Sequence, residues 1–386
     1  MNRINKAKED CCGCSACASI CSHQAIKMEP DGLGFLYPKI NNALCVDCGL
    51  CEKVCSFKSD YDHSANYEIP LAYAVRHKDM KEIETSRSGA AFIALSDKII
   101  NNGGVVYGAG YEGHFRVVHK RATSKEERNE FKGSKYVQSD INNVFSQVRA
   151  DLKEGLQVVF SGTPCQTSGL LSYVDKKLRK NLFLVDLVCH GVPAPYIWRD
   201  YLNFMEEKAG EEVIAVNFRD KSRLGWSAHK ESFAFRRGIT YSYTYTYTFY
   251  EHIMFRKSCG KCKFANLNRP SDVTLADFWG WQKVVPEFNA DNKGISLVLV
   301  NTPKGKEWFD SVENEVKRKE VKIEGVMQPN LIHPTEIHKR RDDFERDYMK
   351  RGFIYVMKKY GNCGWKYKVK RSLLLVKIIV KRITRR

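Results

Sequence analysis

The fold of the first 60 residues is decided by one stretch, CCGCSACASIC at residues 11–21, which returns as CVDCGLCEKVC at residues 45–55. Both stretches separate four cysteines by two, two and three residues, so the same pattern occurs twice. The chain starts with a polar segment instead of the apolar core of a secretory signal, and we therefore expect a cytoplasmic protein whose thiols stay reduced. Dense cysteines in that compartment indicate metal ligands rather than disulfides.

The repeated spacing is typical of bacterial ferredoxins, in which three closely spaced thiolates bind one [4Fe–4S] cluster and the fourth binds the other. It predicts two clusters. Cluster I takes Cys11, Cys14, Cys17 and Cys55, and cluster II takes Cys45, Cys48, Cys51 and Cys21. Two zinc sites are the alternative, because CxxC pairs also bind zinc, but a duplicated run favours the clusters. Cys12 fits neither set and is expected to take no part.

The net charge of the 386-residue chain is +18, which suits a nucleic acid, a membrane surface or an acidic partner. Half of this charge lies in residues 366–386, which hold nine Lys and Arg and no acid. No helix-turn-helix, zinc-finger or RRM-type motif accompanies it, so no nucleic-acid partner is expected. The apolar residues 373–380 are too few to span a bilayer. They suit an interfacial helix, giving peripheral contact with the inner face of the membrane, or a terminal helix packed on its own domain.

Beyond the cysteine-rich segment, apolar runs alternate with helical patterns, which predicts an α/β fold. Helices are expected at 91–101, 142–153 and 304–316, and residues 167–174 are expected to begin a further helix. Strands are expected at 105–107, 156–160, 182–188, 213–218, 231–235 and 296–300. The uninterrupted apolar strands favour a parallel sheet with helices on both faces. A hydrophobic content of 43% and the lack of an apolar run of about 18 residues exclude a polytopic membrane protein.

These patterns divide the chain into four parts, and a polar linker at 56–70 connects the first part to the second. The parts are a dicluster ferredoxin domain (1–60), an N-terminal α/β region (71–200), a C-terminal region with a CxxC pair (201–330) and a basic helical extension (331–386).

Two further patterns need interpretation. Residues 108–113 read GAGYEG, but residues 114–119 predict a second strand instead of the helix that a dinucleotide-binding fingerprint opens, so we interpret the glycines as a hairpin turn. Residues 240–250 alternate Thr or Ser with aromatic residues and predict a strand with its aromatic rings on one face. That face would pack on a core or, alternatively, stack a flavin or a base.

Four more cysteines form a candidate third site: Cys165, Cys189, Cys259 and Cys262. The first two follow apolar strands, at the edge where parallel sheets place their ligand sites, and the last two form a CxxC pair. Spacing alone leaves three possibilities open: a cluster, a zinc ion bound by four thiolates, or Cys165 as a nucleophile activated by His190.

Longer motifs resemble the coenzyme F420-reducing hydrogenase/dehydrogenase beta-subunit family over residues 70–330. They are RSG at 87–89, FKGSKYVQS at 131–139, SGTPCQ at 161–166, DLVCHGVP at 186–193, RPSDVTLADFWG at 269–280 and GISLVLVNT at 294–302. The resemblance implies one or more flavin-binding α/β domains behind a bacterial-type dicluster ferredoxin module of the α+β class. It also implies that the four additional cysteines hold a third [4Fe–4S] cluster beside FAD.

The resemblance further implies which residues bind the flavin. They are Ser88, Gly89, Gly133, Ser134, Lys135, Tyr136, Gln138, Ser139, Gly162 and Thr163. Lys135 would neutralise one phosphate charge. His190 is a candidate catalytic residue, and Asp277 and Trp279 are candidates for contact with flavin or substrate; alternatively, His190 only bonds a loop carbonyl. Ala90 stands where family members often have a second glycine.

The sequence therefore predicts an iron–sulfur flavoprotein oxidoreductase. Electrons would pass between ferredoxin or a similar redox partner protein, the clusters and FAD, so that a small organic substrate or a deazaflavin is reduced or oxidised. The alternative is an electron-transfer subunit of a larger redox complex, with no substrate of its own.

Overall fold

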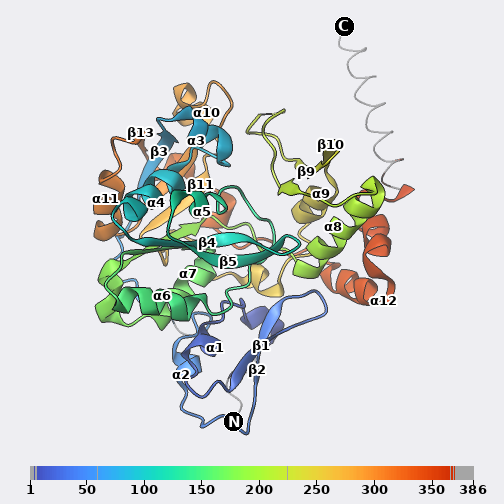
Figure 1. Ribbon diagram of the computed structural model, residues 1–386, viewed down its shortest axis with the longest axis horizontal. Coiled ribbons are helices and arrows are strands. Elements are labelled where there is room, and N and C mark those ends of the chain that lie inside the picture. The colour runs from blue at the N-terminus through green and yellow to red at the C-terminus, as the bar shows by residue number, and fades with distance from the viewer. Residues whose placement is uncertain are drawn as a thin grey trace.

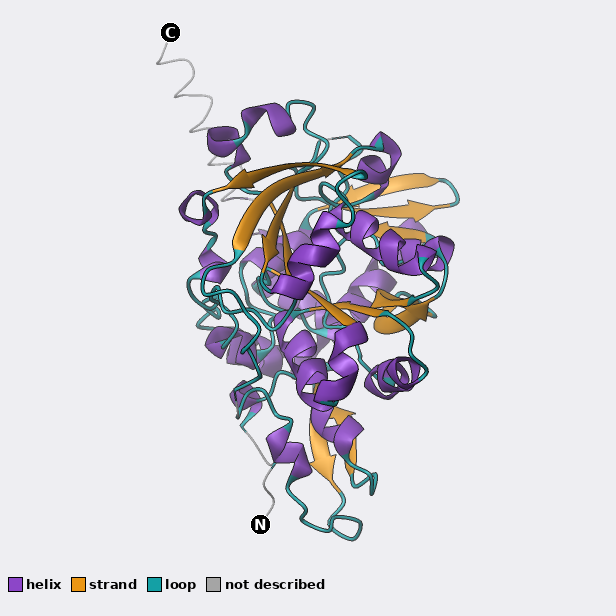
Figure 2. Ribbon diagram, turned by 90° about the vertical axis from the view of Figure 1, so that its left-hand side faces the viewer, coloured by secondary structure: helices purple, strands orange, loops and turns teal. Residues whose placement is uncertain are grey.

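The computed structural model describes residues 4, 7–58, 60–223, 225–365, 367 and 369 and arranges them in three parts (Figure 1). An N-terminal module of residues 7–58 lies at one end of the molecule, a large sheet with its helices lies above it, and a small sheet with α8, α9 and α12 lies at the side (Figures 1 and 2). Apart from Tyr367 and Val369, the basic tail 366–386 and its predicted membrane contact fall outside the described residues. Within those residues, no helix is long and apolar enough to cross a membrane.

The N-terminal module is built around its two cysteine runs. Its elements are α1 (Ala16–Ile20), the antiparallel hairpin β1 (Ile26–Pro30) and β2 (Leu36–Ile40), and α2 (Leu50–Lys53). Gly13 and Gly49 have φ angles of +71° and +74°, which glycine adopts without a steric cost. Both glycines lie between cysteines, so the backbone can turn tightly around each set of thiols.

The large sheet has eight strands in the order β13-β3-β12-β11-β7-β6-β4-β5. The strands are β3 (Leu71–His77), β4 (Val105–Glu112), β5 (Arg116–Ala122), β6 (Val158–Gly162), β7 (Leu182–Leu187), β11 (Val273–Asp277), β12 (Ser296–Val300) and β13 (Val316–Val321). Only the central run β4-β6-β7-β11 is parallel, and the other pairs are antiparallel. The expected parallel sheet is therefore a mixed sheet, to which residues 71–200 and 201–330 both contribute strands.

Both faces of the parallel strands are buried, which explains their uninterrupted apolar sequences. Val106 and Val159 pack with α4 and α11 on one face, whereas the next residues along each strand, Tyr107 and Phe160, pack with α6 and α7 on the other. The helices of this part are α3 (Met80–Thr85), α4 (Ala91–Asn101), α5 (Lys125–Asn129), α6 (Val144–Lys153), α7 (Pro164–Tyr173), α10 (Trp281–Val284) and α11 (Pro303–Asp310). Core residues of the N-terminal module, Cys14 and Ala16, join the face that carries α6 and α7.

Two helix boundaries differ from the predicted ones by three residues or more. α7 begins three residues earlier than expected, because Thr163 and Gln166 form a capping box and Pro164 takes the first helical position. α11 ends at Asp310, six residues earlier than expected, and Val316 opens β13. The hairpin interpretation of residues 108–113 is correct in kind, since β4 and β5 pair antiparallel, but Gly108 and Gly110 lie within β4 and only Gly113 lies in the turn.

The predicted aromatic strand at 240–250 is wrong. The third part of the fold contains a small antiparallel sheet of β8 (Ala215–Asn217), β9 (Glu231–Phe235) and β10 (Gly238–Ser242). After β10 the chain turns into α9 (Thr244–Tyr250), which packs with α8 (Pro195–Ala209) and α12 (Arg341–Lys359). Tyr245 and Phe249 are four residues apart, so a helix also places them on one buried face. The alternation of Thr or Ser with aromatic residues at 240–250 therefore does not distinguish a strand from a helix.

Candidate metal centres and active-site cleft

The cysteines predicted for cluster II line a cavity of about 180 Å³ at the outer end of the N-terminal module. They are Cys21, Cys45, Cys48 and Cys51. Cys45 and Cys48 are exposed, and three large apolar side chains around them, Leu44, Val46 and Leu50, are 40–58% exposed. The cluster II cavity therefore opens to the surface within an apolar patch.

The cysteines predicted for cluster I line a second, smaller cavity of about 30 Å³, deeper in the module. They are Cys11, Cys14, Cys17 and Cys55. Burial raises the pKa of Cys17 to about 12, so this thiol becomes a thiolate only when a metal replaces its proton. The structure thus brings together the exchanged sets, three cysteines of one run with the last cysteine of the other.

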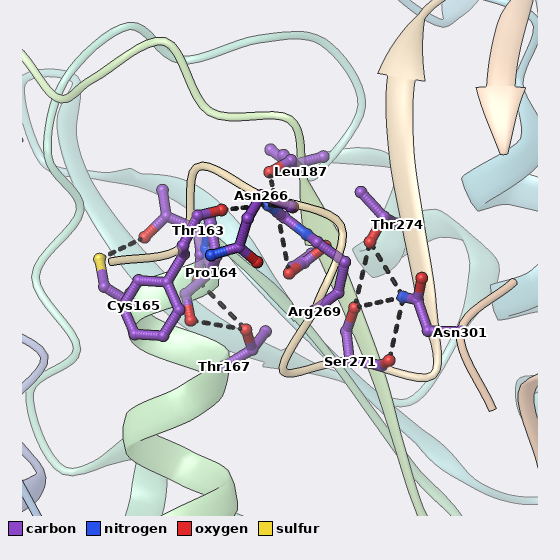
Figure 3. Close-up of polar contacts among 12 residues, drawn as sticks. Thr163, Pro164, Cys165, Thr167, Leu187, Asn266, Arg269, Ser271, Thr274 and Asn301 are labelled. Carbon is purple, nitrogen blue, oxygen red and sulfur yellow. Dashed lines mark hydrogen bonds and ion pairs between the residues drawn. The ribbon is translucent and has the colours of Figure 1, made fainter. Parts of the chain in front are cut away.

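The four additional cysteines also converge, on a third thiol cavity of about 30 Å³. Cys165 lies in the first turn of α7, Cys189 follows β7, and Cys259 and Cys262 belong to a single 3₁₀ turn and its end. Among the polar groups that contact these sulfurs, the Thr163 Oγ1 lies 3.2 Å from the Cys165 Sγ (Figure 3), and the Val192 N–H donates to the Cys259 Sγ at 3.4 Å. Cys12 lines this cavity and the cluster I cavity alike.

A buried ion pair fixes the segment that follows Cys262. The Arg269 guanidinium pairs with the Asp186 carboxylate of β7 at 3.1 Å and donates to the Leu187 carbonyl at 2.8 Å (Figure 3). Both charged side chains are 0–1% exposed, and burial raises the pKa of Asp186 despite its partner. This pair ties the CxxC segment to the strand end from which Cys189 follows.

The geometry bears on the two alternatives to a cluster at the third thiol cavity, which are Cys165 as a nucleophile activated by His190 and a zinc ion. The His190 Nε2 lies 2.8 Å from the His252 Nε2, and burial lowers the pKa of His190 to about 4. Hydrogen bonding with Cys12 and burial raise the pKa of Cys165, which opposes a free thiolate nucleophile. For zinc, no three His, Cys, Asp or Glu side chains in the described part of the chain converge on a point suited to a single ion.

A cleft of about 460 Å³ adjoins the third thiol cavity, a size within the range of small-molecule sites. Eight of the ten predicted flavin-binding residues line it: Ser88, Gly133, Ser134, Lys135, Tyr136, Ser139, Gly162 and Thr163. Gly133 has a φ of +79°, and a Cβ built on it would meet no atom within 4 Å, so the backbone here borders open space. The stacked rings of Tyr136 and Phe249, 4.5 Å apart, add an aromatic wall.

The other two predicted flavin-binding residues do not line the cleft. Gly89 packs against β3 and β12, where a Cβ would lie 2.2 Å from the Val75 carbonyl oxygen. Gln138 is buried and faces the N-terminal module, where its amide donates to the Cys12 carbonyl at 2.8 Å.

Lys135 and Ala90 take roles that sequence reasoning did not anticipate. The Lys135 ammonium donates to the carbonyls of Glu130 and Lys132, and burial lowers its pKa to about 8, so it braces its own loop. Ala90, at the start of α4, has a φ of +61°, a conformation in which glycine is favoured.

The far end of the cleft is rich in charge and aromatic rings. Arg87 and Arg219 share the carboxylate of Asp277 and line the cleft with it. Burial alone would raise the pKa of Asp277, but the two guanidinium groups lower it. Trp279, also predicted to contact the ligand, lies in the same wall with its ring 4.8 Å from that of Trp226. This end carries one positive charge more than the single carboxylate neutralises.

The four hollows are adjacent to one another and share wall residues. Cys51 lines both the cluster II and cluster I cavities. Cys12 and Phe57 line both the cluster I and third thiol cavities, and Cys189 and His190 line both the third thiol cavity and the cleft. Of these junction residues, the sequence singled out His190 and the cysteines but dismissed Cys12, whose position beside Cys11 was the available signal.

Two family profiles match the chain. One, described as the C terminus of the coenzyme F420 hydrogenase/dehydrogenase beta subunit, matches residues 155–325, and one described as a 4Fe-4S dicluster domain matches residues 10–59. Among solved structures, a chain from the F420-reducing [NiFe] hydrogenase complex of Methanosarcina barkeri is 16% identical with a TM-score of 0.45, covering 75% of this chain and 91% of that one. A search of curated proteins found no match.

Proposed function

Since residues 155–325 match the family of the C terminus of the coenzyme F420 hydrogenase/dehydrogenase beta subunit and residues 10–59 match a 4Fe-4S dicluster domain, we propose that the chain is an iron–sulfur flavoprotein oxidoreductase. Electrons from a ferredoxin-type donor enter at cluster II, pass through cluster I and a third cluster, and reach FAD in the cleft. A small organic substrate or a deazaflavin exchanges electrons with the flavin there.

The adjacency of the four hollows carries this proposal. Neighbouring cavities share wall residues, so cofactors held in them lie close enough for electrons to pass from one to the next. The exposed Cys45 and Cys48 make the cluster II cavity the end that a protein partner can reach, and the apolar residues around them suit a docking surface.

The donor set of the third thiol cavity fits a [4Fe–4S] cluster, because four thiols line one hollow in addition to that of Cys12, and a backbone N–H points at one sulfur. The cleft fits a flavin for a different reason. Gly133 leaves open space, and Tyr136 and Phe249 supply an aromatic wall for a ring system. FAD, when bound, converts single electrons from the clusters into two-electron chemistry on the substrate.

Among the chain's own residues, His190 holds the junction between the third cluster and the cleft. Its neutral ring packs against Phe249 at 5.3 Å and is oriented by His252. We assign it a positioning role toward both cofactors and, because it lines the cleft, contact with the bound ligand.

Iron and flavin contents test the proposal. Protein purified anaerobically and reconstituted with iron, sulfide and FAD should hold about twelve irons, as three clusters of four, and one flavin per chain. The Cys259→Ser variant should hold about eight irons, keep the flavin, and lose fast flavin reduction by reduced ferredoxin. Cys363→Ser is the matched control, because Cys363 lines none of the four hollows, and its iron content should equal that of the wild type.

The same measurement separates the alternatives. About eight irons in the wild type would contradict a third cluster. Twelve irons without bound flavin would favour the electron-transfer subunit without a substrate of its own. If flavin binds, a screen of organic acceptors that includes coenzyme F420 identifies the substrate class.

A further inference from the structure

Arg256 is a fully buried guanidinium at the junction of the cluster I and third thiol cavities. It is 0% exposed, lines the third thiol cavity, and precedes Cys259 by three residues. Its Nη2 lies 3.7 Å from the Cys11 Sγ, and its Nε donates to the Cys11 carbonyl at 2.8 Å. A Cβ on Gly13 would lie 2.7 Å from its Nη1, so the cluster I loop fits closely over this side chain.

The charge of Arg256 has no carboxylate to balance it. Among the described residues, no Asp or Glu forms an ion pair with it, whereas the other largest fully buried arginines, Arg128 and Arg269, each have one. Its other donors go to neutral groups, the Gln138 Oε1 and the Leu36 carbonyl, each at 2.9 Å, and its guanidinium stacks 4.1 Å from the centre of the Tyr37 ring. An isolated buried charge is costly, so its counter-charge must come from the thiolates on either side.

We infer that Arg256 is the counter-ion of cluster I and the third cluster, and that its positive charge raises the reduction potentials of both. This inference rests on the proposed third cluster and the proposed ligand assignment. Four thiolates around an oxidised core leave each cluster with a net charge of about −2. One electron from the donor adds one more negative charge, and a cation held close by in a medium of low dielectric constant favours that reduced state.

The direction of the effect follows from three features of Arg256. Net charge, hydrogen bonds to the sulfurs and exclusion of water are the protein's means of setting the potential of a cluster. Arg256 supplies the first two at Cys11 and is itself completely buried, so solvent and salt screen its charge little. Among the described residues, no Lys or Arg lines the cluster II cavity, so cluster II lacks such a neighbour there.

The test is a redox titration of the anaerobic, fully loaded protein, followed by the EPR signals of the reduced clusters. In Arg256→Gln, cluster I and the third cluster should become harder to reduce by at least tenfold in the electron-transfer equilibrium, which is about 59 mV for a one-electron couple. The potential of cluster II should not change. Arg256→Lys keeps the charge and should stay nearer to the wild type than to Arg256→Gln.

Gln138→Glu provides an independent variant that leaves Arg256 in place. It introduces a carboxylate where the Gln138 Oε1 now accepts from Arg256, and it should lower the same two potentials by pairing with the cation. Arg341→Gln is the matched control. Arg341 is 3% exposed and donates to the neighbouring Phe255 carbonyl, but Glu345 already pairs with it.

Two results would overturn the inference: unchanged potentials in Gln138→Glu, or an equal shift in Arg256→Lys and Arg256→Gln, which would indicate a packing effect. The iron content of each variant is measured alongside. A wild type with only eight irons would contradict the proposed function, whereas a loaded protein with unshifted potentials contradicts only the role of Arg256.

Discussion

Single residues in the left-handed region of the backbone decide how closely the chain can approach its ligands. Gly13 and Gly49 turn the two cysteine loops, and Gly133 borders the cleft. Ala90 takes the same conformation with a side chain, at an intrinsic cost of about 1 kcal/mol or more. The position that the family often fills with a second glycine therefore keeps the backbone geometry of a glycine in this chain.

Gly133→Ala should weaken flavin binding. The substitution adds a methyl group to the open space of the cleft and strains a backbone with φ of +79°, at a cost of about 1 kcal/mol. Gly155→Ala is the control, because Gly155 has a φ of +86° and equally open surroundings but does not line the cleft. Both variants should lose similar stability in thermal unfolding, and only Gly133→Ala should raise the dissociation constant for FAD. Equal affinities would remove Gly133 from the flavin site.

At the scale of elements, the sequence predicted most of the buried helices and strands but missed some of the residues at which they begin or end. The limits of α4, β9 and β12 coincide with the predicted ones, because each is a clear apolar pattern. The start of α7 was missed although its capping box is visible in the sequence as Thr163 and Gln166. The aromatic helix at 244–250 could not be separated from a strand, since the surrounding core, and not propensity, decides between them.

The buried pair of Arg269 and Asp186 links two such elements, and breaking it on one side should be severe. Arg269→Met leaves the Asp186 carboxylate buried and unpaired, which should lower the free energy of unfolding by about 3–5 kcal/mol. The double variant with Asp186→Asn should recover at least about 1 kcal/mol of that loss, because the uncompensated charge is gone. Urea denaturation of the two variants measures the difference.

A surface pair gives the contrast. Lys319 and Glu287 are each about half exposed, and Lys319→Met should cost less than about 1 kcal/mol of unfolding free energy.

For the buried pair, a contradicting outcome is a double variant, Arg269→Met with Asp186→Asn, that is no more stable than Arg269→Met alone. That result would show that packing, and not the unpaired carboxylate, dominates the loss of stability.

At the scale of the whole molecule, the site depends on contacts that no local pattern reveals. The cysteine spacing predicted which cysteines line the cluster II and cluster I cavities together, and most of the residues predicted from the motifs around 131–139 and 161–166 line the cleft. Arg256 and Cys11 are 245 positions apart, and nothing in the sequence near Arg256 indicates that it meets the cysteine loop. Gly89 and Gln138 lie outside the lining of the cleft for the same reason, because residues beside a motif can face another part of the fold.

Acid should destabilise the folded chain through its buried histidines. Burial lowers the pKa of His119 from 6.5 to about 4, so the unfolded chain binds one more proton at this residue between those values. Stability therefore rises with pH across this window and is lost as the pH falls from 6.5 towards 4, by up to about 1.4 kcal/mol per pH unit. His119→Gln should reduce that slope by about one proton in denaturant unfolding measured at several pH values. A slope in His119→Gln equal to that of the wild type would refute the assignment.

Because the cluster II cavity opens to the surface, it determines where oxidation of the protein by air begins. Dioxygen meets Cys45 and Cys48 at the surface before it reaches the thiols of the inner cavities. Oxidation should therefore begin at the exposed end of the N-terminal module and proceed inwards. Under the proposed function, oxidative damage would first reach the site at which the donor would deliver electrons. A protein damaged there would lose electron exchange with that donor before the proposed inner clusters and flavin react with oxygen.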